Sequence, residues 1–261
     1  MDNRPIGVFD SGLGGLTVLS ELAKLMPNEN FIYFGDTARV PYGSKSKNTI
    51  IEYSRQIVSF LIKQNVKMVV IACGTASSLA YETIKSEFNI PIIDVILPTA
   101  NNLSTKCAGI IATNASIKSG VWKNKLKTKN PSAKIYEKAC PLFVPIVEER
   151  LINSKLADDA IELYLSQIKK RNIDALILGC THYPLLYEKI KSYLPATTRI
   201  ININSFCAKK VKKVLEAKSL NAKKTNKQKM IAFTTDDVKN FKDNSKKFCN
   251  IEFTKVEKAI L

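Results

Sequence analysis

Two cysteines of this chain follow apolar runs that are typical of β-strands. Cys73 comes directly after residues 66–72, and Cys180 comes shortly after residues 173–178. Hydroxyl residues follow each cysteine within a few positions, and the two cysteines are 107 positions apart. Two thiols at the ends of similar strands could lie on either side of one substrate carbon. Such a pair could remove a proton from one face of that carbon and deliver a proton to the other face.

The single histidine, His182, lies two residues after Cys180. A free thiol has a pKa of about 8.5, so only a few per cent is thiolate at neutral pH. A neighbouring imidazole or a helix N-terminus would raise that fraction. A metal site built from Cys73, Cys180 and His182 is the alternative, but tetrahedral zinc sites usually contain paired ligands at short spacing. We therefore expect no metal here.

A glycine-rich segment, residues 10–15 (Asp-Ser-Gly-Leu-Gly-Gly), lies between an expected strand and an expected helix. Its amides could bind a phosphate or a carboxylate at the helix N-terminus, or the segment could be a simple tight turn. It lacks the spacing of the nucleotide-binding motifs. Asp10 would repel a phosphate, so it suits better a substrate ammonium group or a nearby thiol that needs a base.

Two other segments carry polar groups that could reach the same site. Pro41-Tyr42-Gly43 is either an ordinary loop or, near the strand ends, a loop whose amides and Tyr42 hydroxyl bind a carboxylate. Glu148 and Glu149 follow an apolar run. Most charges on a helix are solvated, but one of these two carboxylates could face the cleft and orient His182.

The composition describes a globular protein with a substantial core. The chain has 261 residues, 45% of them hydrophobic, which fits one large or two small domains. We expect no membrane span, because no apolar run approaches the roughly 20 residues that one needs. The first residues do not have the layout of a signal peptide. We therefore expect a cytoplasmic protein whose six dispersed cysteines are free thiols.

The net charge of +17 comes mainly from lysine, because only six of the 40 basic residues are arginine. This charge could attract anionic substrates or nucleic acid. It could equally reflect a coding bias, since Lys, Asn and Ile are all abundant. Residues 209–229 hold nine lysines and no aromatic residue. Stacking on nucleic-acid bases favours aromatic side chains, so we expect a solvated helix and loop here and no nucleic-acid partner.

Expected strands and helices alternate along the chain, which favours parallel sheets built from βαβ units. We expect strands at residues 6–10, 30–34, 66–72, 91–95, 108–112, 134–137, 173–178, 199–203, 230–234 and 250–253. We expect helices at residues 16–25, 49–64, 77–88, 121–126, 143–151, 157–171 and 206–217. The pattern restarts after Pro98, so we expect two α/β halves: residues 1–95 with 206–261, and residues 96–205. Ligands of such sheets bind at the carboxyl ends of strands, where both cysteines lie.

Assembled in order, these motifs resemble the glutamate racemases of the aspartate/glutamate racemase family. The resemblance extends through most of the chain and is weakest in the lysine-rich C-terminal part. It is carried by GVFDSGLGGLTV (residues 7–18), GDTARVPYG (35–43), AC (72–73) with TAS (75–77), ACPLFVP (139–145) and LGCTHYPLL (178–186).

The resemblance implies two pseudo-symmetric three-layer α/β domains with parallel-rich sheets and the active site at their interface. It implies a cofactor-independent, often dimeric enzyme that makes D-glutamate for peptidoglycan. Cys73 and Cys180 would be the two acid/base groups, assisted by Asp10 and His182, and Glu149 or its neighbour would support His182. Substrate contacts are implied for Asp10, Ser11, Pro41, Tyr42, Gly43, Gly74, Thr75, Thr113, Thr181 and His182.

One departure from the resembled pattern falls inside the site. The family usually has asparagine after the first cysteine, where this chain has Gly74. An asparagine side chain would hydrogen-bond the substrate, whereas Gly74 offers its amide or space for a water molecule. Ala112 and Asn204 depart from the usual glycine and aspartate, and we expect smaller effects from them.

Several other functions fit some of these features. The same fold could racemise aspartate or another amino acid, or Gly74 could leave a weakly active homologue. The two sites could belong to a ligand sensor, or the lysine-rich surface could bind nucleic acid. A pyridoxal enzyme is a further alternative, and it would absorb near-visible light.

Overall fold

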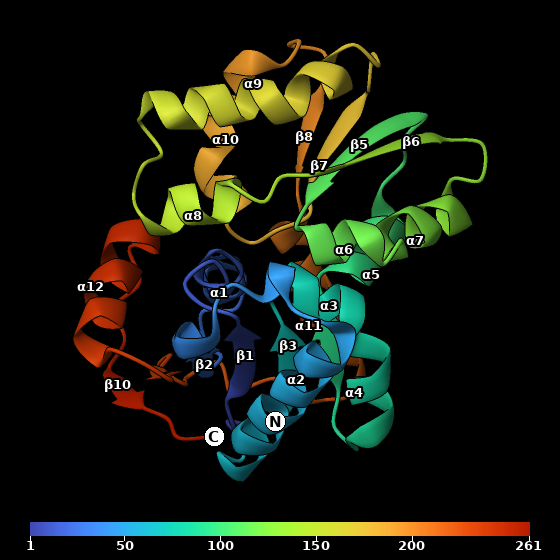
Figure 1. Ribbon diagram of the computed structural model, residues 1–261. Coiled ribbons are helices and arrows are strands. Elements are labelled where there is room, and N and C mark those ends of the chain that lie inside the picture. Colours follow the sequence, from blue (N-terminus) through green and yellow to red (C-terminus); the bar gives the residue numbers. More distant parts are fainter.

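The structure, a computed structural model that describes residues 1–261, contains two β-sheets, one in each half of the molecule (Figure 1). All neighbouring strands are parallel, which confirms the predicted α/β fold with parallel-rich sheets. In spatial order, the larger sheet contains β10 (Lys255–Lys258), β9 (Met230–Thr234), β2 (Phe31–Gly35), β1 (Ile6–Asp10), β3 (Met68–Ile71) and β4 (Ile92–Asp94). The smaller sheet contains β6 (Lys134–Ala139), β5 (Cys107–Ala112), β7 (Ala175–Leu178) and β8 (Arg199–Asn202).

Helices cover both faces of each sheet. In the first half they are α1 (Leu16–Leu25), α2 (Lys47–Lys63), α3 (Gly74–Leu79), α4 (Tyr81–Glu87), α11 (Ile203–Ala217) and α12 (Val238–Cys249). In the second half they are α6 (Asn114–Lys118), α7 (Val121–Lys129), α8 (Phe143–Glu148), α9 (Lys155–Lys169) and α10 (Tyr187–Tyr193). The short 3₁₀ helices are η1 (Thr37–Arg39), η2 (Tyr42–Ser44) and η3 (Tyr183–Leu186). No helix combines the length and hydrophobicity that a bilayer crossing needs.

The central strands are apolar on both faces because both faces are buried. Val8 and Val70 pack into a core cluster that continues into the second half, whereas Phe9 and Ile71 pack into a separate cluster on the opposite face. The smaller sheet divides its side chains in the same way between two clusters. Each half therefore consists of three layers.

The chain passes from the first half to the second through helix α5 (Ile96–Asn102) and returns through α11. These two helices pack against each other. Pro98, after which we expected the pattern to restart, lies in the first turn of α5, where a helix tolerates a missing amide hydrogen. The exact domain boundaries at residues 95 and 205 stay a prediction, because both crossings between the halves run through helices that pack against each other.

The late part of the chain differs most from expectation. Residues 250–253 are not a strand, although Ile251 and Phe253 are buried in the core. The alternation of apolar and polar residues in this segment reflects the burial of its apolar side chains. The hydrogen-bonded pairing of the chain with β9 begins only at Lys255. Helix α12 was not expected because its sequence is mostly polar, and it buries mainly Phe241, Asn244 and Ser245.

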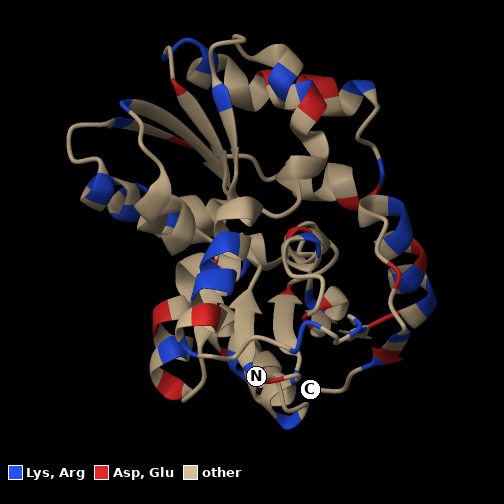
Figure 2. Cartoon of the chain, turned by 180° about the vertical axis from the view of Figure 1, so that it is seen from behind, with Lys and Arg blue, Asp and Glu red and all other residues tan.

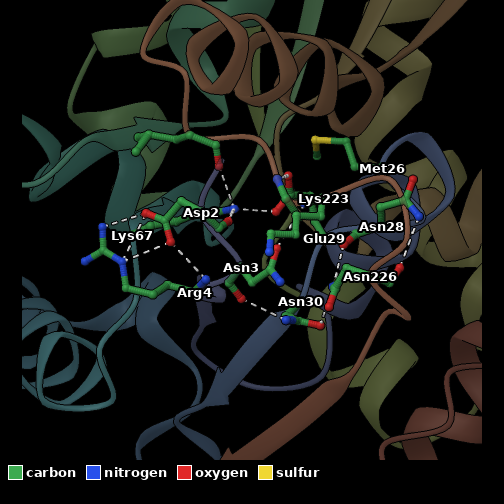
Figure 3. A network of polar contacts seen from close by, with 12 residues as sticks. Asp2, Asn3, Arg4, Met26, Asn28, Glu29, Asn30, Lys67, Lys223 and Asn226 are labelled. Atoms are coloured by element: carbon green, nitrogen blue, oxygen red, sulfur yellow. Dashed lines mark hydrogen bonds and ion pairs between the residues drawn. The ribbon is translucent and has the colours of Figure 1, made fainter.

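A buried ion pair fastens the amino ends of the central strands to the C-terminal part of the chain (Figure 3). Lys67 Nζ lies 2.5 Å from Glu29 Oε2 and also donates to the carbonyl groups of Asp2 and Leu220, at 2.6 and 2.7 Å. The other Glu29 oxygen accepts a hydrogen bond from the Ala222 amide. All three ammonium hydrogens thus have acceptors, which offsets the cost of burying the charge.

Basic residues are distributed over helices of both halves (Figure 2). The lysines of the expected basic segment, residues 209–229, are exposed on α11 and in the loop after it. The predicted solvated helix and loop are therefore confirmed.

We expect Asp94→Asn to stabilise the protein above pH 6. Asp94, at the end of β4, is 2% exposed and accepts hydrogen bonds from the amides of Ile96 and Leu97. Burial raises its pKa from 3.8 to about 6. Between these values the unfolded chain ionises first, so the free energy of unfolding falls as pH rises through this window. Asparagine can accept the same hydrogen bonds without the buried charge, and we expect a gain of about 1–3 kcal/mol at pH 7.

Urea denaturation of wild type and variant at pH 4 and pH 7 measures this gain, which should shrink toward zero at the lower pH. Asp243→Asn is the control, because Asp243 is exposed. An Asp94→Asn gain that does not change with pH would contradict the assignment.

Candidate active site

Cys73 follows β3 and caps the N-terminus of α3. Its Sγ accepts a hydrogen bond from the Ala76 amide at 3.5 Å and lies 3.8 Å from Ser11 Oγ. The side chain is buried. Burial, reinforced by the negative charge of Asp10, raises the pKa of Cys73 to about 12. Cys73 is therefore a protonated thiol at neutral pH and can donate a proton.

Cys180 follows β7 and has an imidazole as its neighbour. Its Sγ lies 3.8 Å from His182 Nδ1, and His182 Nε2 lies 2.5 Å from Glu148 Oε1. Burial alone would lower the pKa of His182, but the hydrogen bonds to Cys180 and Glu148 prevail and raise that pKa well above its usual value. A protonated imidazole beside a sulfur atom stabilises a thiolate. The two cysteines thus lie in contrasting surroundings, as a proton donor and a proton acceptor require.

The carboxylate that supports His182 belongs to Glu148, so the expectation for Glu149 is wrong. Helix α8 ends at Glu148, and Glu149 is its C-terminal cap. Neighbouring residues on a helix project about 100° apart, so only one of two adjacent carboxylates can face the histidine. Glu149 lines a different hollow on the other side of Glu148.

In the glycine-rich segment after β1, the amides of Gly12 and Gly15 face the Asp10 carboxylate. Asp10 is fully buried, and its carboxylate accepts hydrogen bonds from the Gly12 amide at 3.0 Å and from the Thr181 hydroxyl at 3.2 Å. Burial raises its pKa, opposed by the charge of His182 and the amides of Gly12 and Gly15. Asp10 is therefore hydrogen-bonded to Thr181, which lines the cavity, but is not itself among the lining residues, which differs from the expected substrate contact.

The loop at residues 41–43 lines the cavity, but the Tyr42 hydroxyl is already engaged. It donates a hydrogen bond to Asp36, whose carboxylate also accepts from Arg39 at 2.6 Å and from Thr235 at 2.9 Å. In this conformation the Tyr42 hydroxyl therefore does not point its hydrogen at the cavity, where we expected it to bind a substrate carboxylate. The loop contributes its backbone and the Tyr42 ring, and Asp36 fixes its position.

The remaining residues meet at one small cavity of about 90 Å³ between the two halves. Two threonines from opposite halves, Thr75 and Thr113, join their hydroxyls at 2.9 Å across this cavity. The lining residues that the sequence predicted are Ser11, Pro41, Tyr42, Gly43, Cys73, Gly74, Thr75, Thr113, Cys180, Thr181 and His182. The lining residues that it missed are Ser44, Asn114, Pro141, Val144 and Pro145. The motif at residues 139–145 was the signal for the last three of these.

Gly74, in the first half, lies close to the backbone of Gly179 and Cys180 in the second half. A Cβ atom at Gly74 would be 2.4 Å from the carbonyl oxygen of Gly179 and 3.6 Å from Cys180 Cα. The Gly179 carbonyl thus fills the place of any side chain at position 74. No water molecule or larger group fits between these two backbones, so their close approach depends on the glycine.

Neither a metal-like cluster nor a second hollow with a cysteine or histidine accompanies this cavity among the three hollows described. No three His, Cys, Asp or Glu side chains converge in the manner of metal ligands. A larger groove of about 1150 Å³ between α4, α5 and α11 is lined by lysines but contains neither a cysteine nor a histidine. The thiol-lined cavity is the one that contains both of the predicted acid/base cysteines and the histidine.

Comparison with known proteins agrees with this fold. Residues 10–210 match the Asp/Glu/Hydantoin racemase family. The glutamate racemase of Lactococcus lactis subsp. cremoris is 40% identical, over 99% of this chain and 97% of that protein. The glutamate racemase of Hydrogenobaculum is 51% identical over 73% of this chain and 74% of that protein.

Solved structures give the same result. The glutamate racemase of Francisella tularensis in complex with D-glutamate superposes with a TM-score of 0.92 at 38% identity, over 100% of this chain and 98% of that chain. A glutamate racemase isoform from Bacillus anthracis superposes with a TM-score of 0.95 at 32% identity, over 100% and 99%. The fold and the site together define an amino-acid racemase. The chain belongs to the aspartate/glutamate/hydantoin racemase family.

Proposed function

We propose that this protein interconverts L- and D-glutamate, with Cys73 and Cys180 as its two acid/base groups. The observation that supports the proposal most directly is that both cysteines line one small cavity between the two halves. The relatives that share most of the chain are glutamate racemases, and the Francisella tularensis structure contains D-glutamate. We expect the same substrate here, and its D-enantiomer would serve peptidoglycan synthesis.

The mechanism uses one thiolate and one thiol in each turnover. In one direction, the Cys180 thiolate removes the α-proton of glutamate and becomes a thiol. The Cys73 thiol then donates its proton to the opposite face of the carbanion and becomes a thiolate. The reverse direction exchanges the two roles. Because the cavity holds the substrate beside both sulfur atoms, the reaction avoids the entropy cost of bringing these groups together from solution.

The carbanion needs stabilisation, because the proposed mechanism uses no cofactor to delocalise its charge. The cavity wall provides hydroxyl groups on Ser11, Thr75 and Thr181 and the backbone of the loop at Gly43. Such fixed dipoles are most effective in a small, dry site. Asp10 positions Thr181 through its hydrogen bond and so acts indirectly.

Racemisation of glutamate is tested by circular dichroism of the purified protein with L-glutamate and, separately, with D-glutamate. We expect optical activity to decay to zero from either enantiomer, without added pyridoxal phosphate or metal. Run in deuterium oxide, the product should carry one deuterium at the α-carbon. Turnover of L-aspartate with no turnover of glutamate would overturn the substrate assignment.

The resemblance also leads us to propose where the enzyme is located in the cell and how many subunits it has. We place it in the cytoplasm, where peptidoglycan precursors are made, and expect a homodimer. Sedimentation velocity at micromolar concentration would test the oligomeric state directly.

A further inference from the structure

The thiol cavity has a buried end and an exposed end. At the buried end, Cys73 and Cys180 are only 4% and 6% exposed. The hydroxyl residues Ser11, Thr75 and Thr181, which share the cavity wall with them, are buried as well. Only five of the 16 lining residues are exposed, and these are Pro41, Ser44, Asn114, Pro141 and Pro145. These five residues form the mouth of the cavity.

The mouth lies where the two halves of the molecule meet. Pro41 and Ser44 belong to the first half, and the other three residues belong to the second. Helix α6, which begins at Asn114, packs against η2 and against α3 of the first half (Figure 1). A Cβ atom at Gly43 would be 2.7 Å from Thr113 Cβ, so the residue before Asn114 touches the opposite half directly. Asn114 is thus held at the rim by a close contact between the halves.

The position of the two sulfur atoms decides how glutamate must lie in this cavity. Its α-carbon has to lie between the thiols, at the buried end. Its distal carboxylate is two methylene groups further away, and a buried carboxylate costs free energy unless donors surround it. The distal carboxylate therefore belongs at the exposed end. No lysine or arginine lines the cavity, despite a net charge of +17, so neutral donors must bind this carboxylate.

The mouth offers few side-chain donors for a carboxylate. Three of its five residues are prolines, which have no amide hydrogen. The Ser44 hydroxyl already donates a hydrogen bond to the carbonyl group of Pro41, at 3.4 Å. The side chain of Asn114 has two N–H donors, and it hydrogen-bonds to no other residue of the chain. Asn114 therefore has the only free side-chain donors at the mouth.

We propose that the side-chain amide of Asn114 binds the distal carboxylate of glutamate. The inference rests on the proposed racemisation and adds a substrate-binding residue to it. The amide comes from the second half, whereas the loop at Tyr42 and Gly43 offers its backbone from the first half. Asn114 also gives the cavity an amide side chain, which position 74 does not provide.

Steady-state kinetics of the full-length wild type and of Asn114→Ala test this assignment. Circular dichroism gives the initial rates from L-glutamate and from D-glutamate. We expect KM to rise about tenfold or more for both enantiomers, because a hydrogen bond to a charged group is lost. We expect kcat to stay within about twofold, because the distal carboxylate is bound equally well in the ground state and in the transition state.

A charge series at the same position separates binding of a carboxylate from a structural role. Asn114→Asp should raise KM roughly tenfold beyond the alanine variant, because two carboxylates repel each other. Asn114→Lys should keep KM within about threefold of the wild type, because an ammonium group attracts the carboxylate. A purely structural role would give a defect that does not follow the sign of the charge.

Asn101→Asp and Asn101→Lys are the matched controls, because Asn101 is exposed on α5 and lines the other groove. Both should retain the wild-type KM. An unchanged KM in Asn114→Ala overturns the assignment while racemisation stands, as does an equal KM in the aspartate and lysine variants or a loss confined to kcat. Absence of racemisation in the wild type overturns the proposed function, and this assignment with it.

Discussion

Replacing either Cys73 or Cys180 by alanine lowers the rate of racemisation by about 10³-fold or more, in both directions. Positioned acid/base groups contribute 10²- to 10⁴-fold each, and a two-sided mechanism needs both thiols in every turnover. Loss of one thiol therefore affects L-glutamate and D-glutamate alike. The measurement is the initial rate by circular dichroism from each enantiomer, with the variants checked for folding by their far-ultraviolet spectra.

Cys249→Ala is the matched control for these two variants. Cys249 is a free, partly buried thiol at the end of α12 and does not line the thiol cavity. The control should retain the wild-type rate. A Cys73→Ala variant that racemises either enantiomer at full rate would disprove the two-thiol mechanism.

Gly74→Asn, which restores the residue usual in the family, is expected to inactivate this enzyme. The resemblance alone suggests the opposite, because an asparagine could hydrogen-bond the substrate. The geometry favours the loss, since even a Cβ atom at this position would lie 2.4 Å from the Gly179 carbonyl oxygen. The two halves would have to separate, and the sulfur atoms would move with them. A displacement of about 1 Å in an active site can cost roughly 10²-fold in rate.

Gly74→Ala distinguishes the steric effect from any hydrogen bond of asparagine. We expect both variants to lose roughly 10²-fold in kcat, because the Cβ atom is common to both. Gly120→Asn is the control, since Gly120 has a left-handed backbone that asparagine tolerates and its nearest neighbour would be 3.7 Å away. A gain in kcat/KM for Gly74→Asn would show that the halves separate more readily than this conformation indicates.

The sequence by itself determined the fold class and the two thiols. Apolar runs such as residues 6–10 specify buried parallel strands, because a strand covered on both faces needs hydrophobic residues at every position. The motif strings then identified the family, and eleven of the residues singled out beforehand line the thiol cavity. These inferences depend on local patterns, which a chain displays without its tertiary contacts.

Only the tertiary structure decided which partner each polar side chain has. The orientation of α8 relative to His182 places the carboxylate of Glu148, and not that of Glu149, against the imidazole. The Tyr42 hydroxyl donates a hydrogen bond to Asp36, and the Asp10 carboxylate accepts one from the Gly12 amide in its own loop. The lack of room beside Gly74 arises from a carbonyl group about a hundred residues away in the chain. The contacts of Glu148 with His182 and of Gly74 with Gly179 join segments remote in sequence, and no local pattern of residues encodes them.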